Sequence, residues 1–165
     1  MDQLKIYRIA DKYIRFLRSI DQRVQYNKNA RRPYVGVVLI VGSYRYFVPM
    51  ESPKENHKAI KPSKHIFPID SGKYGILGFN NMLPVPSDAL ELIQIEAEND
   101  RKYAELLKRQ ISFINRNKAE IYDRAQKTYF RATTKNKNSF FRKICCDFKR
   151  LERASNQYRS SFQQD

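Results

Sequence analysis

The chain has 165 residues, with 32 Lys and Arg against 17 Asp and Glu, a formal net charge of +15 at pH 7. This length is typical of one domain with a real core, and the charge indicates a polyanionic partner, nucleic acid rather than an anionic membrane surface. The cysteines are two adjacent residues, Cys145 and Cys146, and there are two His, so the composition disfavours a disulfide framework and a structural zinc site.

Apolar patterns predict a β-rich first part of the chain. Residues 34–41 are apolar on both faces and should form the central strand. Gly42 and Ser43 follow as a hairpin turn with glycine first. A helix with an apolar stripe is predicted over residues 11–21, and the polar segment 25–32 is a loop. The remaining strands are predicted over residues 4–9, 44–48, 65–69, 74–79, 82–85 and 90–95, with a turn over residues 70–73.

The segment after residue 48 breaks the strand alternation with a helix-start motif. Ser52 stands where a helix N-cap belongs, Pro53 stands at the first helical position, and Glu55 completes an S-x-x-E capping box. The motif predicts a short helix over residues 53–60. Its N-terminus would present free backbone N–H groups and the positive end of the helix dipole, which together form a site for a phosphate.

Three cations and an imidazole gather on that predicted helix. Lys54, Lys58 and Lys61 share one face at steps of four and three residues, and His57 borders this face. A capping box followed by a solvated basic helix is the plain alternative. The capping box accounts for the hydroxyl and the carboxylate of the motif, but it does not account for the cations and the His.

From residue 98 onward the hydrophobic period becomes helical. Two helices with a break near residues 115–117 are followed by a last helix that Asn138 or Ser139 caps. Residues 127–150 hold eight Lys or Arg and one acid, Asp147. This imbalance favours a nucleic-acid surface, and a solvated helix face is the alternative. The last helix is predicted to bury a stripe of Phe141, Ile144, Phe148, Leu151 and Tyr158.

These elements predict an α+β fold, with a twisted antiparallel sheet and helices packed on it. We expect a single domain over residues 1–165, mostly β over residues 1–96 and helical over residues 97–159, with a frayed tail over residues 160–165. The N-terminus lacks the basic and apolar regions of a signal peptide, and no apolar run approaches membrane-spanning length. We therefore expect a cytoplasmic protein with no membrane partner.

Motifs of metal-dependent and nucleotide-dependent enzymes are missing from the sequence. There is no Walker loop, no G-x-G-x-x-G, no G-x-S-x-G and no H-E-x-x-H. The carboxylates are scattered among cations, so we expect no metal site and no cofactor. Such a chain can still cleave RNA, because the 2′-hydroxyl can attack the adjacent phosphate when a base, an acid and cations are supplied. The products would be a 2′,3′-cyclic phosphate and a 5′-hydroxyl.

Several stretches, in chain order, carry a resemblance to a known family. They are LKIYRI over residues 4–9, PYVGVVL over residues 33–39, and YFVPMESPK over residues 46–54, followed by His57. They resemble the ToxN/AbiQ family, the RNA-neutralised (type III) toxin endoribonucleases of bacteria, over nearly the whole chain. The resemblance implies a partly barrel-like sheet akin to that of the MazF/Kid toxins. It also implies metal-independent, sequence-selective RNA cleavage and a role in abortive infection by phage.

The resemblance also suggests site residues. Ser52 and Lys54 match the family's active-site Ser and Lys, and Tyr13 matches its N-terminal tyrosine. Arg32 stands where a lysine is usual, and Glu51 stands where Thr is usual, so Glu51 would pair with Arg32 or act as the base. The expected catalytic set is Ser52, Lys54, Arg32, Tyr13 and His57. RNA contacts are expected from Tyr26, Lys28, Arg31, Glu51, Lys58, Lys61, Lys135, Lys137, Arg142 and Lys143.

Roles follow for that catalytic set. Lys54 and Arg32 would stabilise the charged transition state, and Ser52 would hold a non-bridging phosphate oxygen. Tyr13 would orient or protonate the substrate. His57 would serve as general base or acid, and a phosphate contact is its alternative role.

The implied partners are target RNA and a small repeated, pseudoknot-like antitoxin RNA that inhibits the protein and that the protein also processes. Head-to-tail contacts with that RNA predict a cyclic protein–RNA hetero-oligomer. The strongest alternative function is a non-catalytic basic RNA-binding module that uses the same patch as a phosphate clamp. A DNA-binding regulator is disfavoured because no helix-turn-helix is recognisable, so we expect no DNA partner.

Overall fold

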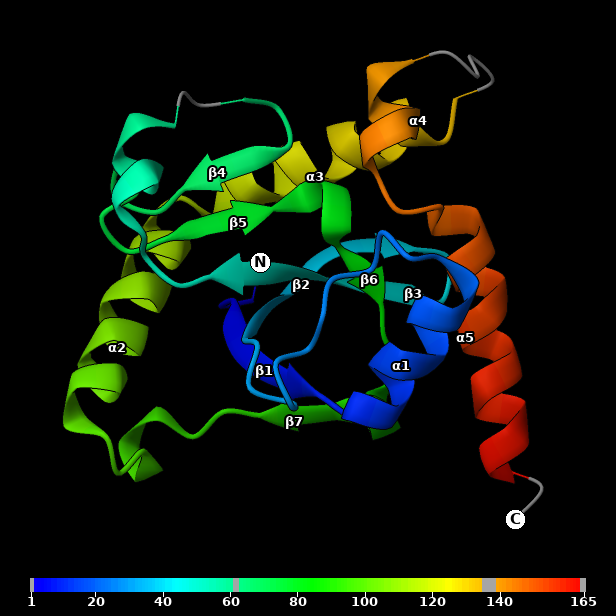
Figure 1. Cartoon of the computed structure of the whole chain (residues 1–165), viewed down its shortest axis with the longest axis horizontal. Coiled ribbons are helices and arrows are strands. Elements are labelled where there is room, and N and C mark those ends of the chain that lie inside the picture. Colours follow the sequence, from blue (N-terminus) through cyan, green and yellow to red (C-terminus); the bar gives the residue numbers. More distant parts are fainter. Residues whose placement is uncertain (1, 61–62, 135–138, 164–165) are drawn as a thin grey trace.

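The computed structural model describes residues 2–60, 63–134 and 139–163, and it shows one sheet with helices packed around it (Figure 1). Three predicted RNA contacts, Lys61, Lys135 and Lys137, lie outside these residues. The strands are β1 Lys5–Ile9, β2 Tyr34–Val41, β3 Tyr44–Glu51, β4 Ile66–Pro68, β5 Ile76–Gly78, β6 Leu83–Pro84 and β7 Leu90–Leu92. The helices are α1 Asp11–Ile20, α2 Arg101–Arg116, α3 Lys118–Ala132, α4 Phe140–Ile144 and α5 Phe148–Gln163, with a short 3₁₀ helix, η1, over Glu55–Ala59.

The sheet is antiparallel and open, in the order β4-β5-β3-β2-β1-β7, with β6 pairing to β3. This confirms the predicted α+β class and the central place of residues 34–41. The register of β2 against β3 shifts between Gly36 and Leu39. Such bulges bend a strand, and Figure 1 shows β2 strongly curved. β3 pairs with β2, β5 and β6, so its last residues lie between two parts of the sheet.

Two glycines shape the hairpin of β2 and β3. Gly42 has a φ of +58°, in the left-handed region that glycine adopts without steric cost. This conformation confirms the predicted turn. Gly36 lies opposite Phe47 in the ladder, and a Cβ on Gly36 would lie 2.2 Å from an atom of that ring. The phenyl ring therefore requires glycine at position 36.

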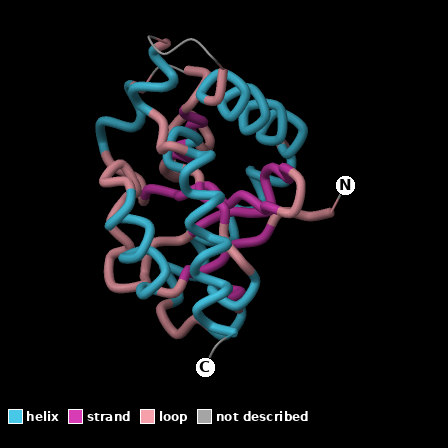
Figure 2. The backbone as a smooth tube through the Cα atoms, turned by 90° about the vertical axis from the view of Figure 1, so that its right-hand side faces the viewer, coloured by secondary structure: helices cyan, strands magenta, loops and turns pink. Residues whose placement is uncertain are grey.

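The helices bury the apolar stripes that the sequence predicts. α1 buries Tyr13 and Leu17, and the chain breaks between α2 and α3 at Asn117, within the predicted break. α2 buries Leu107, and α3 buries Ile121. Figure 2 shows the strands in the middle of the molecule with helices around them. None of the helices in the described ranges is long and apolar enough to cross a membrane.

A buried carboxylate joins three of these elements. Tyr46 of β3 and Tyr129 of α3 donate hydrogen bonds to Oε2 of Glu152, on α5, at 2.7 and 2.8 Å. Tyr46 is fully buried, and Glu152 is 5% exposed. Because a buried hydroxyl without a partner costs about 1–3 kcal/mol, the paired arrangement ties α5 and α3 to β3.

The predicted single last helix is wrong, because the chain forms two helices there. Ser139 caps α4, and its hydroxyl accepts a hydrogen bond from the backbone N–H of Arg142 at 3.2 Å, as its sequence position predicts. The chain then leaves the helix, and the N–H of Cys146 donates to the carbonyl of Asn80 at 2.9 Å. This tertiary bond takes an N–H that a continuous helix would need, so α5 begins only at Phe148. α5 reaches Gln163 and thus extends into the segment where we expect fraying.

Candidate active site

The candidate site forms where β2 begins and β3 ends. The N–H of Met50 donates to the carbonyl of Pro33 at 3.0 Å, so the two strand ends lie side by side. This contact brings the loop before β2, with Lys28 and Arg32, next to the segment 51–54 after β3. Lys28 interacts electrostatically with both Arg32 and that segment. Two stretches that are separate in the sequence therefore form one cationic site.

The loop that carries Lys28 has an unusual backbone. Residues 28–30 have φ of 50°, 56° and 63°, three consecutive left-handed residues without a glycine. Such a conformation costs about 1–2 kcal/mol per residue for an L-amino acid. The carbonyl of Asn27 accepts the N–H groups of Arg31 and Arg32, both at 3.1 Å, and its side-chain amide donates to the carbonyl of Ile9 at 2.8 Å. These bonds hold the loop in a conformation that places Lys28 in the site.

Arg32 is a buried cation with an unused donor. Its side chain is 7% exposed, and Nε donates to the carbonyl of Tyr26 at 2.8 Å. Nη1 is buried, and no described residue accepts a hydrogen bond from it. A buried charge is costly without an opposite charge nearby, so an anion bound at the site would stabilise this guanidinium through its charge. The predicted pairing of Arg32 with Glu51 is not present, because the Glu51 carboxylate contacts His57 instead.

The pKa of Lys28 indicates how much positive charge surrounds this residue. Partial burial, followed by the charges of Arg32 and Lys54, lowers the pKa of the Lys28 ammonium, and Glu51 opposes that shift. A cation loses affinity for its proton when other cations surround it. Three cations therefore converge here, and a bound phosphate would relieve their mutual repulsion.

The segment after β3 is not the predicted helix over residues 53–60. Ser52, Pro53 and Lys54 are non-helical and exposed, and only η1 follows. The hydroxyl of Ser52 does not cap this turn. Instead, Nδ1 of His57 accepts the backbone N–H of Lys54 at 3.2 Å, and the N–H of His57 donates to the Lys54 carbonyl at 3.0 Å. Because the imidazole takes the capping position, the hydroxyl of Ser52 is free to face a ligand.

His57 lies behind the site rather than in it. Its side chain is 2% exposed, and Nε2 lies 3.3 Å from Oε2 of Glu51. With Nδ1 on the Lys54 amide, both ring nitrogens have partners within the protein. The predicted roles of His57 as a proton-transfer group or a phosphate contact therefore do not fit its position, since neither nitrogen is open to RNA.

Two glycines pack against the backbone of the site. The sequence analysis did not single them out as functional. They lie in the turn between β4 and β5, with φ of +86° at Gly72 and +100° at Gly75. A Cβ on Gly72 would lie 2.2 Å from the carbonyl oxygen of His57, and one on Gly75 would lie 2.0 Å from that of Glu51. The turn thus packs directly against the site backbone. A turn that needs glycine in the left-handed region can be recognised from the sequence. Which backbone segment packs against that glycine depends on tertiary contacts.

Tyr13 is not brought to this site. Its side chain is fully buried, and its hydroxyl donates to the carbonyl of Pro84 at 2.6 Å. The ring packs edge-on against Tyr158, with 4.8 Å between centroids. Burial, and then the neighbouring Tyr158, raise the pKa of Tyr13 far above its usual value. The hydroxyl holds α1 to β6 in the core, and the predicted orienting or protonating role has no geometric support.

The other predicted RNA contacts that the structure describes lie either near the site or on α4. Tyr26 is 72% exposed, and the guanidinium of Arg18 lies 3.6 Å from the centre of its ring. Since its carbonyl binds Arg32, the ring lies at the rim of the site, where a base can stack. Arg31 is exposed on the same loop, while the ammonium of Lys58 lies 3.2 Å from Glu55. Arg142 and Lys143 are exposed on α4, which Figure 1 shows well apart from the site.

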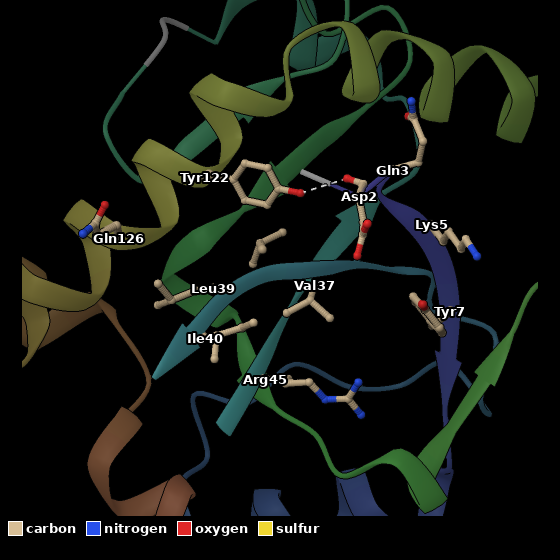
Figure 3. Close-up of a pocket in the computed structure, with 11 residues that line it drawn as sticks. Asp2, Gln3, Lys5, Tyr7, Val37, Leu39, Ile40, Arg45, Tyr122 and Gln126 are labelled. Atoms are coloured by element: carbon tan, nitrogen blue, oxygen red, sulfur yellow. Dashed lines mark hydrogen bonds between the residues drawn. The ribbon is translucent and has the colours of Figure 1, made fainter. Parts of the chain in front are cut away.

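A hollow lies at the other end of β3 (Figure 3). It has a volume of about 940 Å³, with Val37, Leu39 and Ile40 of β2 among its apolar residues. Tyr122 of α3 borders it and donates a hydrogen bond to the carbonyl of Asp2 at 3.2 Å. The hollow contains none of the predicted site residues. Its cations, Lys5 of β1 and Arg45 of β3, are accompanied by Asp2.

The fold and the site together define a class of protein. This chain is a small α+β protein with a hydroxyl and three cations on two neighbouring segments at the end of a sheet strand. Among the described residues, no three His, Cys, Asp or Glu side chains gather as metal ligands. The family model described as "Toxin ToxN, type III toxin-antitoxin system" matches residues 5–156. The chain belongs to this family.

Individual relatives agree with this assignment. The endoribonuclease ToxN of Bacillus thuringiensis subsp. kurstaki is 32% identical over 166 residues, which cover 96% of this chain and 86% of the relative. A solved structure described as a type III toxin inhibited by a non-coding RNA pseudoknot is 31% identical with a TM-score of 0.85, covering 96% and 99%. The structure of AbiQ, described as a lactococcal anti-phage endoribonuclease, is 27% identical with the same TM-score and coverage.

Proposed function

We propose that this protein is an endoribonuclease toxin that cleaves RNA without a metal ion, using the 2′-hydroxyl as the nucleophile. The observation that carries the proposal is the contact of Met50 with Pro33, which brings the loop with Lys28 and Arg32 next to the exposed segment with Ser52 and Lys54. Three cations and a hydroxyl provide what a phosphodiester needs when negative charge builds up on its oxygens. Membership of a toxin family with relatives named endoribonucleases supports this proposal.

The site residues divide the work as follows. The 2′-oxygen attacks the neighbouring phosphorus, and the bond from phosphorus to the 5′-oxygen breaks. Lys54 binds the non-bridging oxygens, with Ser52 as a neutral donor to one of them, and the buried guanidinium of Arg32 adds positive charge nearby. Tyr26 stacks a flanking base. The products carry a 2′,3′-cyclic phosphate and a 5′-hydroxyl.

Cleavage is expected to persist in excess EDTA and to stop when a single 2′-deoxy nucleotide is placed at the cut site. The first result follows because the transition state is stabilised by side-chain cations, and the second because the nucleophile is absent. Both are measured with an end-labelled RNA on a gel, with mass spectrometry of the product ends. Cutting of the substituted RNA at the same bond contradicts the 2′-hydroxyl mechanism. RNA binding without cleavage favours the non-catalytic binding module.

We propose that the natural inhibitor is a small folded RNA made of repeats, which the toxin also processes. The relative with the RNA pseudoknot motivates this partner. The charge of +15 exceeds what one cleavage site requires, and exposed cations on α4 offer a second surface for the body of such an RNA. An RNA that reaches from the site of one protein to α4 of the next builds a closed ring. A cytoplasmic location, in a role that stops phage, fits such partners.

The toxin co-expressed with its flanking DNA is expected to co-purify with one short RNA of fixed length, in a complex larger than a monomer. Lys143→Glu is expected to weaken this complex, because it replaces an exposed cation on α4 by a negative charge. Lys102→Glu makes the same charge change on the exposed side of α2 and serves as the control. Size-exclusion chromatography at two salt concentrations measures the difference. A harmless, RNA-free monomer from the co-expressing cells contradicts the RNA-inhibitor proposal.

A further inference from the structure

We propose that Glu51 is the general base of this site and that His57 is the positioning residue that aims its carboxylate; the inference rests on the proposed function. It assigns the proton-transfer role to a residue other than the buried imidazole. The cations of the site stabilise charge, but none of them removes the proton from the 2′-hydroxyl while protonated. Glu51 is the carboxylate that lies among them.

The contacts of His57 define which of its nitrogens carries the proton. Nδ1 accepts the backbone N–H of Lys54 at 3.2 Å, so Nδ1 holds a lone pair and no hydrogen. In the neutral ring the hydrogen is then on Nε2, which lies 3.3 Å from Oε2 of Glu51. The nitrogen that carries the hydrogen is therefore the one next to the carboxylate. Since the ring is 2% exposed, it can orient Glu51 but cannot touch the substrate.

Glu51 itself is held at its backbone and open at its carboxylate. It is paired with Ile76 of β5, and Gly75 packs against its carbonyl oxygen. Its side chain is 30% exposed, and Oε1 has no hydrogen-bond partner among the described residues. One carboxylate oxygen thus lies against His57, while the other has no partner among the described residues on this partly exposed side chain. A general base needs this combination of fixed position and one free lone pair.

The step balances with water as the proton donor. Oε1 of Glu51 takes the proton of the 2′-hydroxyl as the bond from the 2′-oxygen to phosphorus forms. The bond to the 5′-oxygen breaks, and the departing oxygen takes a proton from a water molecule. The hydroxide left behind takes the proton from Glu51 after product release, so the site returns to its starting state.

Glu51→Gln is the decisive variant, because the amide keeps the size of the side chain and an oxygen beside His57 while the group can no longer act as a base. We expect kcat/KM to fall about 100-fold or more with RNA affinity retained. The acidic limb of its pH profile should disappear, a change that a purely structural role does not produce. Glu55→Gln is the matched control, since Glu55 is 91% exposed and pairs only with Lys58 among the described residues. That control is expected to cleave like the unmodified protein.

His57→Gln tests the positioning role separately. We expect a fall in kcat of about 10-fold with little change in KM, and an acidic limb that shifts but remains, because the base is still present and only its orientation is lost. Cleavage is measured on the same RNA, with thermal unfolding of each variant alongside. A His57→Gln protein that folds and cleaves with an unchanged rate and pH profile overturns this half of the inference.

The outcomes separate this inference from the proposed function. If Glu51→Gln cleaves at the unmodified rate with its acidic limb intact while Lys54→Ala is inactive, the inference is wrong and the endoribonuclease proposal stands. If the unmodified protein cleaves no RNA, the proposed function fails. If Glu51→Gln does not fold, the pH dependence of kcat/KM of the unmodified protein still tests the inference. A kcat/KM that stays constant as the solution is acidified through the range in which carboxylates take up protons excludes a carboxylate base.

Discussion

Lys54→Ala is expected to lower kcat for RNA cleavage by about 100-fold or more and to abolish toxicity in cells. Lys54 is exposed just after the end of β3, where it forms no ion pair with a described acid and adds to the charge around Lys28. Its ammonium is free to meet the negative charge that develops on the phosphate, and removing one such donor typically costs about 10²–10³ in rate. Single-turnover cleavage of a short RNA measures the chemical step directly.

The fold should be unaffected by this change, because the loop is held by the backbone of Lys54 and not by its side chain. The N–H and carbonyl that contact His57 are both kept in alanine. Lys73→Ala is the control, since it removes an exposed ammonium from the turn that packs behind the site. A folded Lys54→Ala protein that remains fully toxic places the activity elsewhere in the molecule.

Gly75→Ala is expected to damage both stability and activity. Its φ of +100° is a conformation that costs an L-residue about 1–3 kcal/mol. The added Cβ would also lie 2.0 Å from the carbonyl oxygen of Glu51, so the end of β3 must move. A displacement of about 1 Å at a reacting group can lower the rate about 100-fold. We expect a clear fall in the melting temperature together with a loss of cleavage.

Gly42→Ala separates the cost of a positive φ from the effect of the contact with Glu51. Gly42 also has a positive φ, +58°, but a Cβ there meets nothing within 4 Å. The alanine should therefore cost about 1 kcal/mol, or about 2–4 °C in melting temperature, with cleavage unchanged. Equal losses of activity in the two variants would show that the contact between Gly75 and Glu51 does not position the site.

Much of the fold follows from patterns that local chemistry produces. The doubly apolar run 34–41, the Gly42-Ser43 turn and the helix break near Asn117 all depend on residues close in sequence, and all three are present. The errors arise where tertiary hydrogen bonds prevail. Cys146 lies between Ile144 and Phe148 of the predicted helical stripe, yet its N–H donates to the carbonyl of Asn80. Ser52 has the sequence context of a cap, yet the imidazole of His57 satisfies the N–H that matters.

The candidate site also combines residues that can be identified from the sequence with contacts that only the tertiary structure determines. Ser52, Lys54 and Arg32 are recognisable from the motif and from the resemblance, and the structure brings their segments together. Tyr13 has the right position in the sequence, but its hydroxyl is used in the core by Pro84. The partnership of Glu51 with His57 could not be predicted, because a carboxylate among cations is expected to pair with one of them. In the structure Glu51 instead contacts the buried imidazole of His57.

The hydrogen bond between Tyr46 and Glu152 affects how a cell can escape this toxin. β3 ends in the site, and it is anchored to a carboxylate 106 residues further along the chain. A frameshift or stop codon ahead of α5 removes that anchor and uncovers the strand, even though every proposed site residue has already been translated. The coding sequence upstream of residue 152 is therefore one continuous target for inactivating mutations. We expect a shortened gene product without α5 to be inactive, because the strand that ends in the site has lost its anchor.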